Sequence, residues 1–146
     1  MSKKTQLRIF SVIIFILAIY DLITLGLDIY AGVFKKIVNE DMLVQDIANI
    51  TMLVALGCSV LSIWFGFYLS KKGMKEAKNC TGARLHIFVA RLSGFFNLIL
   101  FLILGLALLD STDLLYDLQT LGICFVDMIL MFGYAKAAKA VRKGEY

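Results

Sequence analysis

Long runs of apolar residues, separated by short polar segments, dominate the pattern along the chain. A helix that crosses a bilayer needs about 20 mostly apolar residues, and four stretches reach that length. Membrane strands are a poor alternative, because runs such as 98–104 do not alternate between apolar and polar positions. The pattern predicts an all-α membrane protein, a bundle of four transmembrane helices at about 9–34, 47–69, 87–109 and 114–135.

The polar segments predict how these helices are organised. At 146 residues the chain is short enough for one domain, so we interpret residues 1–146 as a single transmembrane domain. The loop 70–86 is expected to extend the second helix by a turn or two, and the basic tail 136–146 to continue the fourth. The N-terminal charges and apolar run are typical of a signal peptide, but the apolar pattern continues to residue 34 without a cleavage site. We therefore interpret this segment as a retained first helix.

The positive charges indicate the orientation. The chain is 60% hydrophobic, with a net charge of +4, whereas soluble domains are about 45–50% apolar. Twelve Lys and Arg residues flank the predicted spans on one side and two on the other. Positive residues stay cytoplasmic, so both termini are predicted to be cytoplasmic. Anionic lipid headgroups are the expected partners of this face, and we expect no nucleic acid. The expected location is the inner (plasma) membrane of a prokaryote.

Two pairs of short, similar sequence segments are consistent with a parallel hairpin repeat. Residues 20–23 (Tyr-Asp-Leu-Ile) are similar to 96–99 (Phe-Asn-Leu-Ile), and 65–67 (Phe-Gly-Phe) to 132–134 (Phe-Gly-Tyr). Parallel repeats are one arrangement known in transporters. Matches this short also arise by chance in apolar sequence, so the repeat and chance similarity both stay open.

Small residues four positions apart allow close approach of helices. Their meaning is either oligomerisation or packing within one bundle, and the spacing alone does not decide between these two. The pairs are Ser62 with Gly66, Ala90 with Gly94, and Gly133 with Ala137.

Four polar residues lie where polar residues are costly. A charge at the bilayer centre costs about 2.5–3.5 kcal/mol on insertion scales, so such residues tend to face a partner or a cavity. Asp21 and Asn97 fall near the middle of their spans, and Asp127 within a turn of it. Arg91 lies about 9 Å from Asn97 along the helix, and its side chain could reach either toward Asp127 or toward the headgroups. We predict that Asp21, Asn97 and Asp127 form a midplane site for a cation or proton, with Arg91 as a counter-charge.

A structural interpretation competes with this site. Arg91 could pair with Asp127, while a protonated Asp21 donates a hydrogen bond to Asn97 and stabilises the bundle. Both interpretations require the polar groups of three helices to meet in the hydrocarbon layer.

Near the predicted outer ends of the helices lie Asp28, Asn49 and Asp117. They could form an outer mouth that gathers cations by its local field, or they could be ordinary solvated helix ends. The single histidine, His86, is expected at the cytoplasmic membrane interface. No catalytic or metal-binding motif is present in the sequence, so we expect no enzyme activity, no cofactor and no metal.

Two functions follow as hypotheses. In the first, the protein is a small transporter or channel-like subunit for a cation, a proton or a small cationic solute. It would act as a homo-oligomer, because four helices barely enclose a pathway. In the second, it is a non-catalytic accessory or regulatory subunit that packs against a larger membrane complex. An intramembrane enzyme is disfavoured for want of a nucleophile or metal ligands.

Overall fold

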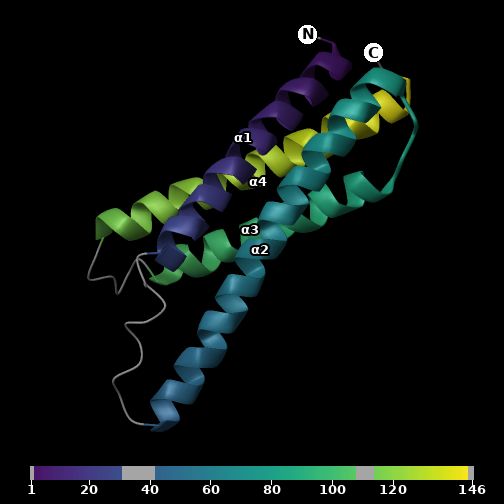
Figure 1. The fold of residues 1–146 in the computed structure, drawn as a ribbon. Helices are drawn as coiled ribbons and strands as arrows, with labels where there is room; N and C mark the ends of the chain where they lie inside the picture. The colour runs from purple at the N-terminus through teal and green to yellow at the C-terminus, as the bar shows by residue number, and fades with distance from the viewer. Residues whose placement is uncertain (1, 31–41, 108–113, 145–146) are drawn as a thin grey trace. The chain divides into compact units, whose positions relative to one another are not determined.

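All regular secondary structure in the described residues is α-helix (Figure 1). The structure, a computed structural model, covers residues 2–30, 42–107 and 114–144, without the side chains of 28, 42–55, 107 and 114–117. This confirms the all-α class. The four helices are α1 (Lys3–Tyr30), α2 (Met42–Asn79), α3 (Leu85–Ala107) and α4 (Leu114–Arg142).

Three helices extend beyond their predicted apolar spans into the adjacent polar segments. α1 begins at Lys3 instead of residue 9, α2 continues to Asn79 and α4 continues to Arg142. These polar segments are rich in Ala, Lys, Glu and Arg, which favour helix, and the chain has no proline to interrupt them. The expected helical extension of the second and fourth apolar runs is therefore present, and the predicted loop 70–86 shortens to residues 80–84.

Three helices are long and apolar enough to cross a membrane: Lys3–Leu27 in α1, Leu85–Leu106 in α3 and Leu118–Arg142 in α4. Over its described residues α2 is not a clear span. Large apolar side chains cover the outside of the helices; Leu102 and Ile103 are both 57% exposed. A continuous apolar surface of this kind is unfavourable in water and favourable in lipid. The fold therefore indicates a membrane protein.

The helices form two compact units. Unit 1 comprises Met1–Val12 and Leu69–Tyr146, and unit 2 comprises Ile13–Tyr68. Unit 1 thus contains the first turns of α1, the last turns of α2, and all of α3 and α4. Unit 2 contains the remainder of α1 and α2.

Within unit 1, α3 and α4 lie side by side and antiparallel (Figure 1). A Cβ built on Gly94 would lie 3.3 Å from Met131 and Phe132. About two turns further along α3, the rings of Phe101 and Phe125 lie 5.6 Å apart. These contacts fix the antiparallel register of the two helices: as residue numbers increase along α3, the numbers of the facing residues in α4 decrease.

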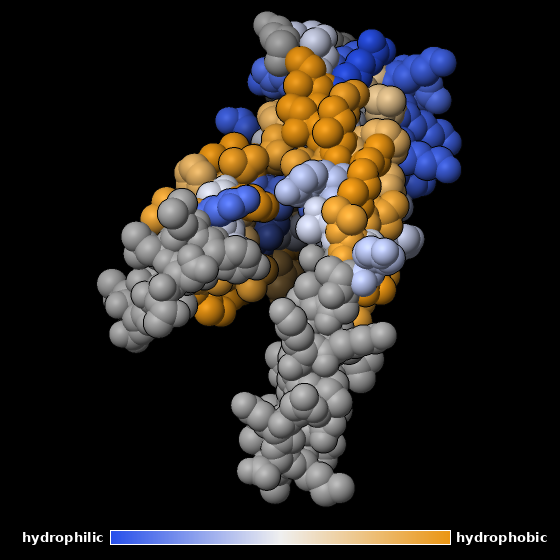
Figure 2. All heavy atoms as spheres, turned by 60° about the vertical axis from the view of Figure 1, so that its left-hand side comes forward, coloured by the Kyte–Doolittle hydropathy of each residue, from blue (hydrophilic) through white to orange (hydrophobic). Residues whose placement is uncertain are grey.

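Small residues bring the other helices of unit 1 close to α4. A Cβ on Gly73 of α2 would lie 2.2 Å from the Ser11 hydroxyl and 2.6 Å from the Tyr134 ring. A Cβ on Gly133 would lie 2.7 Å from the ring of Phe10 in α1. The first turns of α1 and the last turns of α4 therefore share one end of unit 1, and Figure 2 shows hydrophilic residues gathered at this end.

A tight connection joins α2 to α3 in unit 1. Cys80 and Gly82 both have left-handed backbone conformations, with φ of 50° and 71°, which is a common way to end a helix. The Glu76 carboxylate accepts hydrogen bonds from the Gly82 amide (2.6 Å) and from the Thr81 hydroxyl. Glu76 is almost fully buried, and these bonds compensate the cost of burying its charge.

In unit 2, α1 and α2 also meet at small residues. A Cβ on Gly66 would lie 2.8 Å from the Ala18 Cβ, and the rings of Phe15 and Phe67 form an edge-to-face contact at 5.6 Å. Gly66, like Gly94 and Gly133, belongs to one of the small-residue pairs in the sequence. In all three pairs the glycine contacts another helix of the same chain, which favours packing within one molecule.

Candidate functional site

Asp21 lines a small, partly open pocket in unit 2, called the Asp21 cavity below. The cavity has a volume of about 200 Å³, which is enough for several water molecules. Each helix contributes residues at positions i, i+3 and i+4, which share one face of a helix. The lining residues are Asp21, Thr24 and Leu25 of α1, and Ser59, Ser62 and Ile63 of α2.

The polar atoms at this cavity are oxygens. Thr24 donates its hydroxyl hydrogen to the Tyr20 carbonyl at 3.0 Å, which leaves the lone pairs of its oxygen available to accept. Ser59 and Ser62 add two further hydroxyls from the opposite helix. One carboxylate with several neutral oxygens is an environment that can accept a proton or a cation.

Of the residues that line this cavity, only Asp21 was predicted as a site residue from the sequence. Its expected partners were polar groups of the third and fourth helices, whereas the described cavity takes its hydroxyls from α2. The sequence feature that points to these neighbours is their spacing: Ser59 and Ser62 are three residues apart, as are Asp21 and Thr24. Such a pair lies on one face of an otherwise apolar helix.

The other three residues of the predicted midplane site lie in unit 1. The register of α3 and α4 places Asp127 level with Ile99, two residues from Asn97, which corresponds to about 3 Å along the axis. Both side chains are partly exposed. Asn97 and Asp127 therefore lie at nearly the same level along the α3–α4 pair, and their depth in a membrane stays a prediction. Their meeting with Asp21 stays a prediction.

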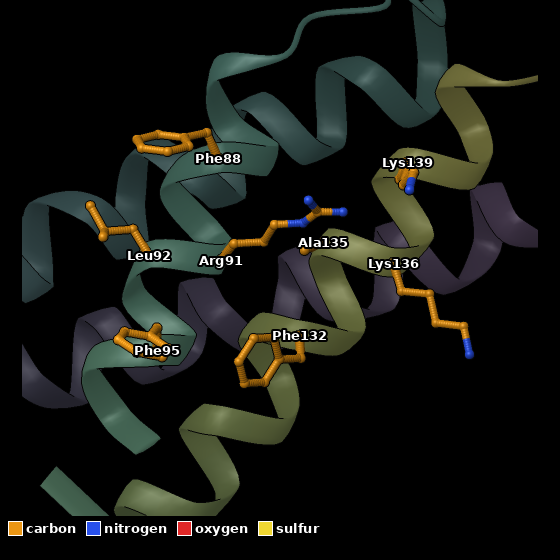
Figure 3. A pocket seen from close by; sticks show the side chains of 8 residues that line it. All are labelled: Phe88, Arg91, Leu92, Phe95, Phe132, Ala135, Lys136 and Lys139. Atoms are coloured by element: carbon orange, nitrogen blue, oxygen red, sulfur yellow. The ribbon is translucent and has the colours of Figure 1, made fainter. Parts of the chain in front are cut away.

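Arg91 lies at a different level from Asp127. It lines a groove with Ala135, eight residues along α4 from Asp127, which is about 12 Å at the rise of an α-helix. Figure 3 shows its guanidinium reaching from α3 toward α4, between Ala135 and Lys139. From the sequence, the Arg91 side chain could point toward Asp127 or toward the headgroups. In the structure it points away from the level of Asp127.

The predicted outer mouth lies outside the residues whose side chains are described. This applies to Asp28, Asn49 and Asp117 alike. The interpretation of these residues stays a prediction.

His86 is a buried residue of unit 1, with 1% of its surface exposed. Its ring makes an edge-to-face contact with Tyr134 at 6.0 Å. Neither ring nitrogen has a hydrogen-bond partner among the described residues. The expectation of an interface position for His86 stays a prediction: the residue lies next to the start of the candidate span Leu85–Leu106, and its ring is buried within unit 1.

Comparison with known proteins assigns the chain to no family. No protein-family model, no curated protein and no solved structure matches it. In the part of the chain that was searched for metal ligands, no group of three or more His, Cys, Asp or Glu side chains could hold a metal ion. The features that bear on function are therefore the Asp21 cavity and the surfaces of unit 1.

Proposed function

We propose that the protein is a small transporter or channel-like subunit that moves a proton, another small cation or a small cationic solute, and that Asp21 binds this cargo. The cavity around Asp21 is the observation that carries the proposal. A carboxylate in a helix otherwise apolar enough to span a membrane is costly unless it faces a partner or a cavity. Here it faces a cavity with three hydroxyl groups.

The charge of the cavity limits the cargo. Among the described residues that line it, Asp21 is the one acidic residue and none is basic. Binding of one proton or one monovalent cation would neutralise the site, whereas a divalent cation would leave a net positive charge in the span. We therefore infer a cargo of charge +1.

Neutralisation also provides a mechanism. An ionised carboxylate favours the aqueous side of the membrane, while a neutral or cation-paired one tolerates the hydrocarbon layer. Loading and unloading of Asp21 would thus bias the helices between conformations that expose the cavity to opposite sides.

The topology of the proposal comes from the sequence. The stretch 47–69 contains no charged residue, so we propose that α2 crosses the membrane together with α1, α3 and α4. The excess of Lys and Arg at the chain ends and near residues 70–86 would then place both termini in the cytoplasm. Because four helices barely enclose a pathway, we propose that the working form is a homo-oligomer.

Flux measurements on the full chain in liposomes test this function. Imposed gradients of H⁺, Na⁺ and K⁺ would be followed with ion-sensitive dyes for the wild type, Asp21→Asn and Asp21→Glu. We expect flux in the wild type, background flux in Asp21→Asn, and partial flux in Asp21→Glu, which keeps the charge. Wild-type flux in a correctly folded Asp21→Asn protein would contradict the proposal.

A second variant separates the cavity from the wider predicted site. Asp127→Asn also removes a carboxylate within a span, but one that does not line the Asp21 cavity. Retained flux in Asp127→Asn would assign cargo binding to the cavity alone. Equal loss in both variants would support the larger midplane site, whereas no wild-type flux with co-purification of a larger complex would favour the accessory function.

A further inference from the structure

A groove between α3 and α4 in unit 1 combines apolar and cationic side chains. Its volume is about 630 Å³. The four large apolar residues along it are between 41% and 62% exposed, so a molecule beside the helices could reach them. The lining residues are Phe88, Arg91, Leu92, Phe95, Phe132, Ala135, Lys136 and Lys139 (Figure 3).

The cationic part of the groove continues toward the polar end of unit 1. A second hollow of about 200 Å³ shares Arg91 and Lys139 with the first, and adds Arg84 and Arg142. Among the described residues that line the two hollows, none is acidic. Cations gathered without a carboxylate repel one another, and an anion bound between them offsets that repulsion.

The two parts of the groove lie at different depths of the candidate spans. Phe95 and Phe132 lie further into the spans Leu85–Leu106 and Leu118–Arg142, while Arg84 and Arg142 lie at the ends of these spans. Figure 3 shows Arg91 between these two levels, with Phe95 and Phe132 on one side and Lys139 on the other. The lining therefore changes from apolar to cationic toward the ends of these two candidate spans.

We propose that this groove is a binding site for one anionic phospholipid of the adjacent leaflet. Arg91 and Lys139 would bind the headgroup phosphate, with Arg84 and Arg142 next to it. An acyl chain would lie against Phe95 and Phe132. The planar guanidinium of arginine can donate two parallel hydrogen bonds to phosphate, and basic pockets between membrane helices are known sites for anionic lipid headgroups.

A lipid accounts for the groove better than a free phosphate does. A free anion would use the cations alone and leave the exposed phenylalanines without a function. A lipid uses both halves at once, and it is present at high local concentration in the bilayer. The proposal is independent of the Asp21 cavity, which lies in unit 2. It also goes beyond a general attraction between basic residues and anionic headgroups, because it specifies a discrete site.

Lipid titrations on the full-length protein test the site. The protein would be purified in an uncharged detergent and titrated with phosphatidylglycerol or phosphatidylcholine, with bound lipid counted by native mass spectrometry. The groove variant is Arg91→Gln with Lys139→Gln. The matched control is Lys71→Gln with Lys75→Gln, which removes the same charge from exposed positions on α2 that do not line the groove.

We expect the wild type to bind one phosphatidylglycerol more tightly than phosphatidylcholine. The groove variant should bind it about 25-fold more weakly, since each basic side chain near an anionic headgroup contributes about fivefold. The control should keep nearly wild-type affinity. Arg91→Lys keeps the charge but loses the paired donors, so its affinity for phosphatidylglycerol should lie between those of the groove variant and the control. It serves as the milder variant if the double variant folds poorly.

Three results would overturn the proposal. The first is equal affinity for the two lipids. The second is equal loss in the groove and control variants, which would indicate diffuse charge. The third is displacement of phosphatidylglycerol by glycerol 3-phosphate at similar concentration, which would indicate a site for a free phosphate. Helicity and the midpoint of thermal unfolding, measured for every variant, establish that the proteins compared are folded.

Discussion

The Tyr134 hydroxyl of α4 donates a 2.9 Å hydrogen bond to the backbone carbonyl of Leu69 in α2. These residues are 65 positions apart in the sequence, and both are fully buried. The bond joins two helices of unit 1 at the level where small residues bring their backbones close. It gives a buried phenol the partner that such a group requires.

Replacement of Tyr134 by Phe should therefore weaken the association of α2 with α4. Loss of this bond is expected to lower the free energy of unfolding by about 1 kcal/mol, measured by denaturation in mixed micelles. Tyr20→Phe is the control, because that side chain is 56% exposed. Equal stability of the two variants would show that the bond contributes little.

Gly73 should not tolerate a side chain. Gly73→Ala places a Cβ 2.2 Å from the Ser11 oxygen and 2.6 Å from the Tyr134 ring, and overpacking of this kind costs about 1–3 kcal/mol. Gly57→Ala is the matched control, since it also lies in α2 and no neighbour lies within 4 Å of its Cβ. The control should be neutral or more stable by about 0.5–1 kcal/mol. A stable, wild-type-like Gly73→Ala protein would contradict the close packing of these helices.

His86 should be replaceable by an apolar ring. Its nitrogens have no hydrogen-bond partner among the described residues, so His86→Phe removes buried polar atoms while it keeps the ring contact with Tyr134. We expect unchanged or higher stability, by up to about 2 kcal/mol. His86→Ala should instead lose about 2 kcal/mol or more, because it leaves a cavity. Strong destabilisation by Phe would indicate that the imidazole has a partner after all, such as a bound water.

The hydroxyls around Asp21 should distinguish between a proton and a metal cation as cargo. A proton needs only the carboxylate, whereas Na⁺ or K⁺ needs several oxygen ligands. Replacement of Ser59 and Ser62 by Ala should therefore lower Na⁺ or K⁺ flux in liposomes and leave H⁺ flux nearly unchanged. Ser93→Ala is the control, because Ser93 does not line the cavity. If the double variant carries all three ions as the wild type does, the two hydroxyls are not ligands.

Much of the helical framework follows from the sequence alone. Apolar runs of this length have no favourable environment except lipid or protein, and the backbone in lipid must satisfy its own hydrogen bonds, so they form helices. The level of a residue along its helix also follows from the sequence, because each residue adds a constant rise. Asn97 and Asp127 lie at nearly the same level along the α3–α4 pair for this reason. The small-residue pairs likewise marked positions where helices meet.

The tertiary structure decided which faces meet. The direction of a side chain around a helix is known from its number, but the helix that packs against it is not. Asp21 therefore has hydroxyls of α2 beside it, and Arg91 lies in a groove with lysines of α4. His86 is buried, with its ring against Tyr134 of α4. These outcomes depend on packing between distant segments, which hydropathy and spacing along one helix do not specify.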